Sequence, residues 1–172
     1  MRLVLAVLLV TACRYSLDSA EYSDAAQARL CKVSMTTQSC LDADNHSDFT
    51  FVYSSVIKPK CIFDACHDGK QSTPQGMLDL KKDQATAYTN LTTMPSMLDS
   101  TRNIVVAGNP HQSFLSVMLG SIKPSEADPP LDAIPHNSKG DVVGTMPQNS
   151  SIVCCQKLDA VDRWITAGAL ND

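Results

Sequence analysis

The stretch Cys61-Ile62-Phe63-Asp64-Ala65-Cys66-His67 places two thiols in one short segment and an imidazole directly after the second thiol. Covalent attachment of haem requires this set, because the two sulfurs bind the vinyl groups of the porphyrin and the imidazole binds its iron. The usual spacing has two residues between the cysteines, whereas this chain has four. The alternative is a small disulfide loop closed by Cys61 and Cys66, with His67 an ordinary polar neighbour. The motif by itself leaves both interpretations open.

The start of the chain has the pattern of an export signal. Met1-Arg2 precedes an apolar run over Leu3–Val10, which is too short to span a bilayer but fits the core of a secretory signal. Val10-Thr11-Ala12-Cys13 resembles the lipobox of bacterial lipoproteins, so we expect residues 1–12 to be removed and Cys13 to carry lipid. Lipid chains there would anchor the protein to a membrane. The alternative is ordinary signal cleavage, which gives a soluble periplasmic protein. Both routes predict the cell envelope, either as an outer-membrane lipoprotein or in the periplasm.

The seven cysteines are expected to be paired or ligated in an oxidising envelope. When Cys13 and the pair at 61 and 66 are set aside, four disulfide candidates remain: Cys31, Cys40, Cys154 and Cys155. A bond between the adjacent Cys154 and Cys155 would need a strained ring, so bridges from this pair to Cys31 and Cys40 are favoured. The total stays even if Cys61 and Cys66 bond to each other. The cysteine count therefore does not decide between haem and a disulfide loop.

Composition excludes several classes of function. The chain has 14 basic and 18 acidic residues with no basic cluster, which gives no electrostatic footprint for nucleic acid. Sequence motifs for a phosphate loop, a zinc hydrolase or a serine nucleophile are missing. Removal of residues 1–12 from the 172-residue chain leaves 160, enough for one domain with a sizeable core. We expect no catalysis of bond making.

Apolar patterns predict several helices separated by long loops. One pattern runs from Phe49 to Ile57 and predicts a helix that leads to Cys61. A second helix is expected after Asp83, whose side chain can cap it, and continues to Leu91.

Two further helices are expected in the second half of the chain. Asn109-Pro110 predicts the start of one, which carries Phe114–Leu119 and stops at Gly120. The last covers residues 156–169, with Trp164 in its apolar stripe. These patterns predict a mostly α fold, with residues 13–48 as a tether or linker that holds a possible disulfide and residues 49–172 as one domain.

The order of these signals resembles that of cytochrome c-like domains in bacterial envelope proteins. The motifs that carry the resemblance are Cys66-His67-Asp68-Gly69, Leu78-Asp79-Leu80, Gly108-Asn109-Pro110-His111-Gln112-Ser113-Phe114-Leu115, Met146-Pro147 and Trp164-Ile165-Thr166-Ala167-Gly168-Ala169. They occur in the family's order and span about residues 49–170. The resemblance implies a cytochrome c-like small helical domain with long loops.

The resemblance also implies a cofactor and a function. One covalent haem c would be held by Cys61 and Cys66, with His67 as the proximal iron ligand and Met146 as the distal one. Such a protein transfers single electrons to or from a redox partner protein, which the sequence does not identify. The first alternative is a haem-free structural or binding lipoprotein of the same fold, stapled by disulfides. The second is a haem peroxidase or sensor with an open sixth position on iron.

Other candidate ligands have simpler explanations. His46, His111 and His136 lie in segments where an exposed polar side chain is expected. Met94, Met97 and Met118 are expected to fill gaps in the core rather than to bind iron.

Overall fold

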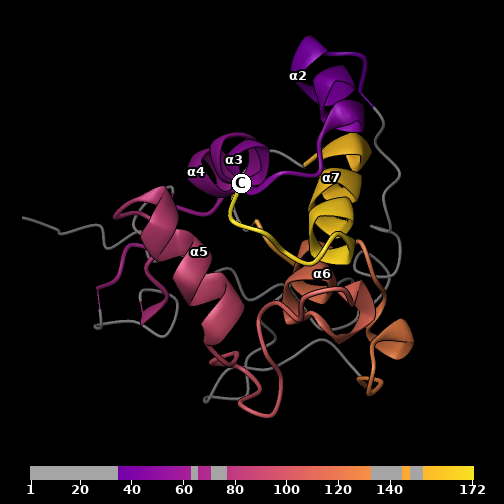
Figure 1. The fold of residues 1–172 in the computed structure, drawn as a ribbon. Coiled ribbons are helices and arrows are strands. Elements are labelled where there is room, and N and C mark those ends of the chain that lie inside the picture. Colours follow the sequence, from indigo (N-terminus) through magenta and orange to yellow (C-terminus); the bar gives the residue numbers. More distant parts are fainter. Residues whose placement is uncertain (1–34, 63–65, 71–76, 133–144, 148–152) are drawn as a thin grey trace, which may run out of the picture.

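The computed structural model describes residues 35–62, 66–70, 77–132, 145–147 and 153–172. The α-helices there are α2 (Gln38–Leu41), α3 (Phe49–Val52), α4 (Lys58–Lys60), α5 (Gln84–Thr93), α6 (Phe114–Leu119) and α7 (Cys155–Thr166). Four helical segments of other types cover Asp42–Asn45, Tyr53–Ile57, Pro110–Gln112 and Pro124–Glu126. Within the described ranges there is no strand, only two isolated bridges, at Asp68–Asp79 and Pro95–Asn103. The prediction of a mostly α fold is confirmed (Figure 1).

The helix that leads to the paired cysteines begins at Phe49 and continues to Lys60. Asp48 caps it, since its carboxylate accepts the backbone N–H of Phe51 at 2.7 Å. The middle turn, Tyr53–Ile57, has π-helical geometry between the α-helical turns of α3 and α4. The apolar pattern therefore predicted this helix correctly, and its last turn includes Pro59.

Helices α3 and α7 pack together through aromatic side chains at the centre of the core. The rings of Phe49 and Trp164 lie 5.0 Å apart, and both side chains are fully buried. Tyr88 of α5 meets the Phe49 ring edge-on, with the ring centroids 5.3 Å apart. The indole N–H of Trp164 donates to the carbonyl of Leu170 at 2.8 Å. Burial without loss of the indole hydrogen bond explains why Trp164 suits the centre of this core.

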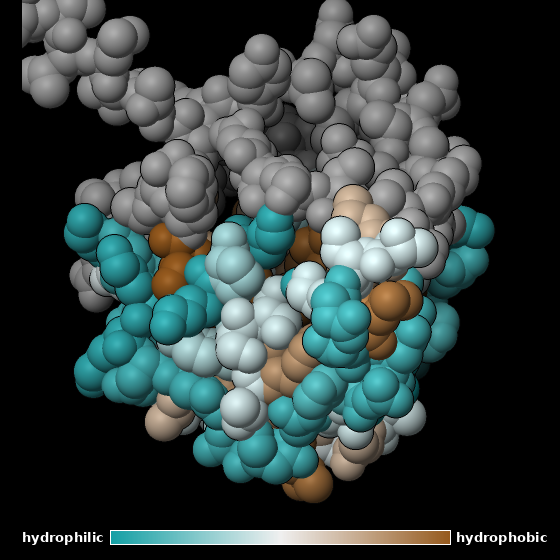
Figure 2. Space-filling view, turned by 90° about the horizontal axis from the view of Figure 1, so that it is seen from above, coloured by the Kyte–Doolittle hydropathy of each residue, from teal (hydrophilic) through white to brown (hydrophobic). Residues whose placement is uncertain are grey.

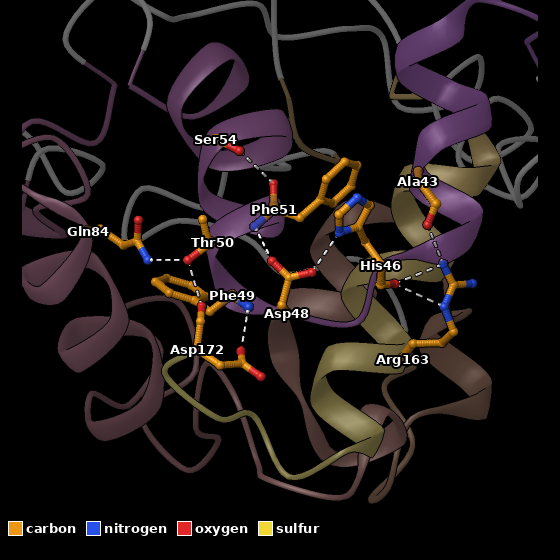
Figure 3. Close-up of polar contacts among 10 residues, drawn as sticks. All are labelled: Ala43, His46, Asp48, Phe49, Thr50, Phe51, Ser54, Gln84, Arg163 and Asp172. Atoms are coloured by element: carbon orange, nitrogen blue, oxygen red, sulfur yellow. Dashed lines mark hydrogen bonds and ion pairs between the residues drawn. The ribbon is translucent and has the colours of Figure 1, made fainter.

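Polar contacts join the N-terminal segments to the C-terminal end of the chain (Figure 3). The guanidinium of Arg163 donates to the carbonyls of Ala43, at 2.6 Å, and His46, at 3.0 Å. The C-terminal residue Asp172 accepts the backbone N–H of Phe49 through its side chain at 2.9 Å. Because these partners are separated by more than a hundred residues, the contacts close the fold around α3 and α7.

A disulfide fixes α2 to one end of α7, as Figure 1 shows for the two helices. It joins Cys40 to Cys154, with their Cα atoms 6.3 Å apart, and Cys155 is disulfide-bonded as well. The bond from Cys40 to the adjacent pair agrees with the favoured pattern. Cys31, the remaining candidate, lies outside the described residues, as do Cys13 and the predicted signal peptide, residues 1–12.

Helices α5 and α6 follow their predicted end signals in part. Asp83 caps α5 by accepting the N–H of Thr86 at 2.7 Å, and Gly120 ends α6 in the left-handed conformation with a φ of 76°. The expected single helix from Asn109 is divided, because Pro110–Gln112 form a separate 3-10 turn before α6. The buried hydroxyl of Ser113 accepts the N–H of Val106 at 2.8 Å, which holds the break in place.

The described surface is largely hydrophilic. Figure 2 shows hydrophobic residues in small areas among hydrophilic ones on the face seen from above. Leu41, Met77, Met97 and Leu170 are the large apolar side chains with substantial exposure in the described ranges.

Candidate functional site

One apolar cleft brings together most of the residues that the haem motif and the Met-Pro loop singled out. Cys61, His67 and Met146 all line it. The rest of its wall is formed by Ile57, Leu78, Leu80, Leu91, Met94, Pro95, Ser96, Met97, Leu98, Ile104, Phe114, Leu115, Met118 and Leu119. Cofactor pockets typically have an apolar lining with a few polar groups, and the lining of this cleft has that composition.

The end of the helix that runs from Phe49 to Lys60 places Cys61 on the cleft wall. The backbone N–H of Cys61 donates to the carbonyl of Ile57 at 2.8 Å, so the residue continues the last helical turn. Burial, and next the nearby Cys66, raise the pKa of the Cys61 thiol to about 12. Neither cysteine takes part in a disulfide in the structure.

The surroundings of Cys61 favour an uncharged sulfur, either a thiol or a thioether, over a thiolate. A thiol with this pKa is protonated at neutral pH, which argues against a role as a catalytic nucleophile. A thioether carries no charge, so its formation in the apolar cleft has no ionic desolvation penalty. Cys66 is half-buried and is not among the described residues that line the cleft.

A short turn holds His67 against the segment that contains Leu78 and Leu80. The carbonyl of His67 accepts the backbone N–H of Leu80 at 3.0 Å, and Asp68 forms a β-bridge with Asp79. Gly69 follows with a φ of 77°. A Cβ atom there would lie 2.8 Å from the Asp79 Cγ atom, so a glycine allows the two segments to approach this closely.

Asp68 and Lys70 bind each other within this turn. The Asp68 carboxylate accepts the backbone N–H of Lys70 at 3.1 Å and meets the Lys70 ammonium at 3.2 Å. Burial acts to raise the pKa of Asp68, but these contacts with Lys70 outweigh it and the pKa is lowered. An ionised Asp68 thus stabilises the turn that presents His67.

Met146 reaches the cleft from the Met-Pro segment. Its backbone N–H donates to the carbonyl of Met118, near the end of α6, at 2.6 Å. Its side chain packs against the main core cluster and also against the smaller cluster of Phe114 and Met118. The structure therefore places the predicted proximal and distal residues, His67 and Met146, on one cleft.

The other histidines lie elsewhere or cannot be placed. His111 is exposed and its Nδ1 atom lies 2.7 Å from the carbonyl oxygen of Glu126. His46 stacks on Phe51 at 4.1 Å and contacts the Asp48 carboxylate at 2.7 Å. Neither lines the cleft. His136 lies outside the described residues.

The loop after α5 forms a cleft wall that the sequence did not indicate. Residues 94–98 all line the cleft. The loop is closed by the Ser96 N–H, which donates to the carbonyl of Arg102 at 2.7 Å, and by the Arg102–Asp99 ion pair at 2.9 Å. Arg102 is 9% exposed and also donates to the carbonyl of Pro130 at 3.3 Å. The sequence predicted Met94, Met97 and Met118 as core residues; this is correct for Met118, which is buried, and wrong for Met97, which is 48% exposed.

Comparison of the chain with known proteins adds no family assignment. In the parts that the structure describes, no helix has the length and apolar character needed to cross a membrane. The same parts contain no group of three or more His, Cys, Asp or Glu residues arranged to hold a metal ion. Searches with protein-family models, against curated proteins and against solved structures find no match to this chain.

Proposed function

We propose that this chain is an envelope-anchored, c-type cytochrome-like protein that binds one covalent haem and transfers single electrons. The observation that supports this proposal best is the shared cleft, whose wall contains Cys61 and His67 of the motif together with Met146, which lies far from them in sequence. Cys66 immediately precedes His67 and lies close enough to Cys61 to influence its pKa. Cys61, Cys66, His67 and Met146 together are the chemical set that a covalently held haem requires, and three of the four line the cleft.

Each residue has a distinct role in this proposal. Cys61 and Cys66 would hold the porphyrin by thioether bonds, and His67 and Met146 would bind its iron. Haem supplies the one-electron exchange when it is bound. The apolar cleft wall would disfavour added charge beside the iron, and the Met146 thioether would be a neutral, soft ligand. Both properties would favour the ferrous state and so raise the reduction potential.

The remaining parts of the proposal concern location and partners. Lipid on Cys13 would tether the domain to the envelope membrane, where a redox partner protein would exchange electrons with it. The Cys40–Cys154 disulfide agrees with an oxidising compartment. This bond equally suits the alternative, a haem-free structural or binding lipoprotein that is held together by disulfides.

The test is to produce the full chain in a host that attaches haem to exported proteins. We expect a denaturing gel stained for haem peroxidase activity to show a band, and the mature protein to gain the mass of one haem. Replacement of both Cys61 and Cys66 by Ser should abolish the stain. The matched control, with both Cys40 and Cys154 replaced by Ser, removes two other cysteines and should keep it. A wild-type protein without Soret absorption would sink the proposal and favour the haem-free alternative.

Anchoring has its own measurement. We expect labelled fatty acid to be incorporated into the wild-type chain and not into a Cys13→Ser variant. Labelling that is the same in both proteins, or absent from both, contradicts a lipid on Cys13.

A further inference from the structure

Methionines are concentrated in the cleft. The chain has seven, and four of them, Met94, Met97, Met118 and Met146, line its wall. Their thioethers are soft, neutral donors of the same chemical type as the distal ligand proposed above. More than one residue on this wall can therefore supply the same ligand chemistry.

Met118 is tied to Met146 by their backbones. The Met146 N–H donates to the Met118 carbonyl at 2.6 Å, which fixes the two residues side by side. Both side chains line the cleft, and both belong to the small apolar cluster around Phe114. A methionine side chain has three rotatable bonds beyond its Cα atom, so two thioethers on neighbouring backbones can reach overlapping positions.

Met118 is better held than the other methionines of this wall. It lies on α6 and is 7% exposed, whereas Met97 is 48% exposed. Helix α6 is itself fixed to α7, because the Ser116 hydroxyl donates to the Asp162 carboxylate at 2.8 Å. The Met118 thioether is therefore presented by a helix that is anchored to the core, and it is shielded from competing water.

We propose that Met118 is a second distal thioether donor, which binds the haem iron when Met146 is absent or withdrawn. This inference rests on the proposed function. In the exchange, the Met146 sulfur would leave the iron and the Met118 sulfur would take its place. Both ligands are neutral thioethers, so no electron or proton would be transferred and the charge of the site would be unchanged.

The experiment compares four haem-loaded, full-length proteins, namely wild type, Met146→Leu, Met118→Leu and the double variant. Leucine matches methionine in volume and leaves the cleft wall apolar. The readout is the weak red absorption band of thioether-bound ferric haem, together with the spin state. We expect both single variants to keep the band and a low-spin iron. The double variant should lose the band and become high-spin or bind a foreign ligand.

A second double variant, Met146→Leu with Met94→Leu, is the matched control because it removes another thioether of the same wall. It should keep the band if Met118 is the substitute, and loss of the band here overturns the assignment to Met118. Loss of the band in Met146→Leu alone, with the haem stain intact, refutes the inference and leaves the proposed function standing. Absence of haem from the wild-type protein refutes both. Far-UV circular dichroism and the haem stain confirm that each variant is folded and loaded.

Discussion

The close approach at Gly69 makes a quantitative prediction about the turn that presents His67. In Gly69→Ala, an L-residue must adopt a φ of 77°, which costs about 1–2 kcal/mol. The new Cβ atom would also lie 2.8 Å from Asp79 Cγ and 2.9 Å from Asp79 Cβ. Asp79 cannot turn away freely, because its carboxylate accepts the backbone N–H groups of Lys81 and Lys82 at 3.0 Å each. Overpacking of this kind costs about 1–3 kcal/mol, which gives a total of about 2–5 kcal/mol.

Gly108→Ala is the matched control for this prediction. Gly108 has nearly the same φ, 80°, but a Cβ atom there meets no atom within 4 Å. Its substitution should cost only the conformational strain, about 1–2 kcal/mol. The effect of Gly→Ala on the entropy of the unfolded chain is common to both variants and cancels in the comparison. The difference between the two losses therefore isolates the contact with Asp79.

The assay is equilibrium unfolding in urea, with the midpoint and slope fitted for both variants and the wild type. We expect equal slopes and a lower midpoint for Gly69→Ala than for Gly108→Ala. Equal midpoints in the two variants would show that the turn at 66–70 does not press on Asp79 in solution, and would remove our explanation for the placement of His67.

Two further perturbations test the fold. Replacement of Cys40 and Cys154 by Ser removes a bond between residues 114 apart and should lower the free energy of unfolding by about 2–4 kcal/mol; unchanged urea midpoints in oxidised protein would contradict this. Burial raises the pKa of Asp162 even though Ser116 and Ser121 donate hydrogen bonds to it. The folded state therefore holds the Asp162 proton to a higher pH than the unfolded state does. As the pH rises above about 4, the free energy of unfolding should fall because of this carboxyl. Urea unfolding from pH 4 to 7 should show wild type losing stability relative to Asp162→Asn, and parallel pH profiles would refute the role of Asp162.

Signals that act within one helical turn were readable from the sequence. Asp83 caps α5, Gly120 ends α6, and the stripe with Trp164 forms α7, as their patterns predicted. In each case the deciding interaction lies within a few residues, such as a side chain that accepts an N–H three positions away. The division of the helix expected at Asn109 was not readable, because it depends on a hydrogen bond from Val106 to Ser113.

The sequence by itself singled out the candidate residues: Cys61, Cys66 and His67 from their motif, and Met146 from the resemblance to cytochrome c-like domains. It also favoured bridges from the 154–155 pair to Cys31 and Cys40, and the structure contains the bond between Cys40 and Cys154. Only the tertiary structure decided that Met118 and the loop at 94–98 complete the same cleft. The physical reason is that apolar side chains gain by burial against any apolar partner. Which apolar segments meet is therefore decided by contacts between distant parts of the chain, such as the hydrogen bond between Met146 and Met118, and not by local pattern.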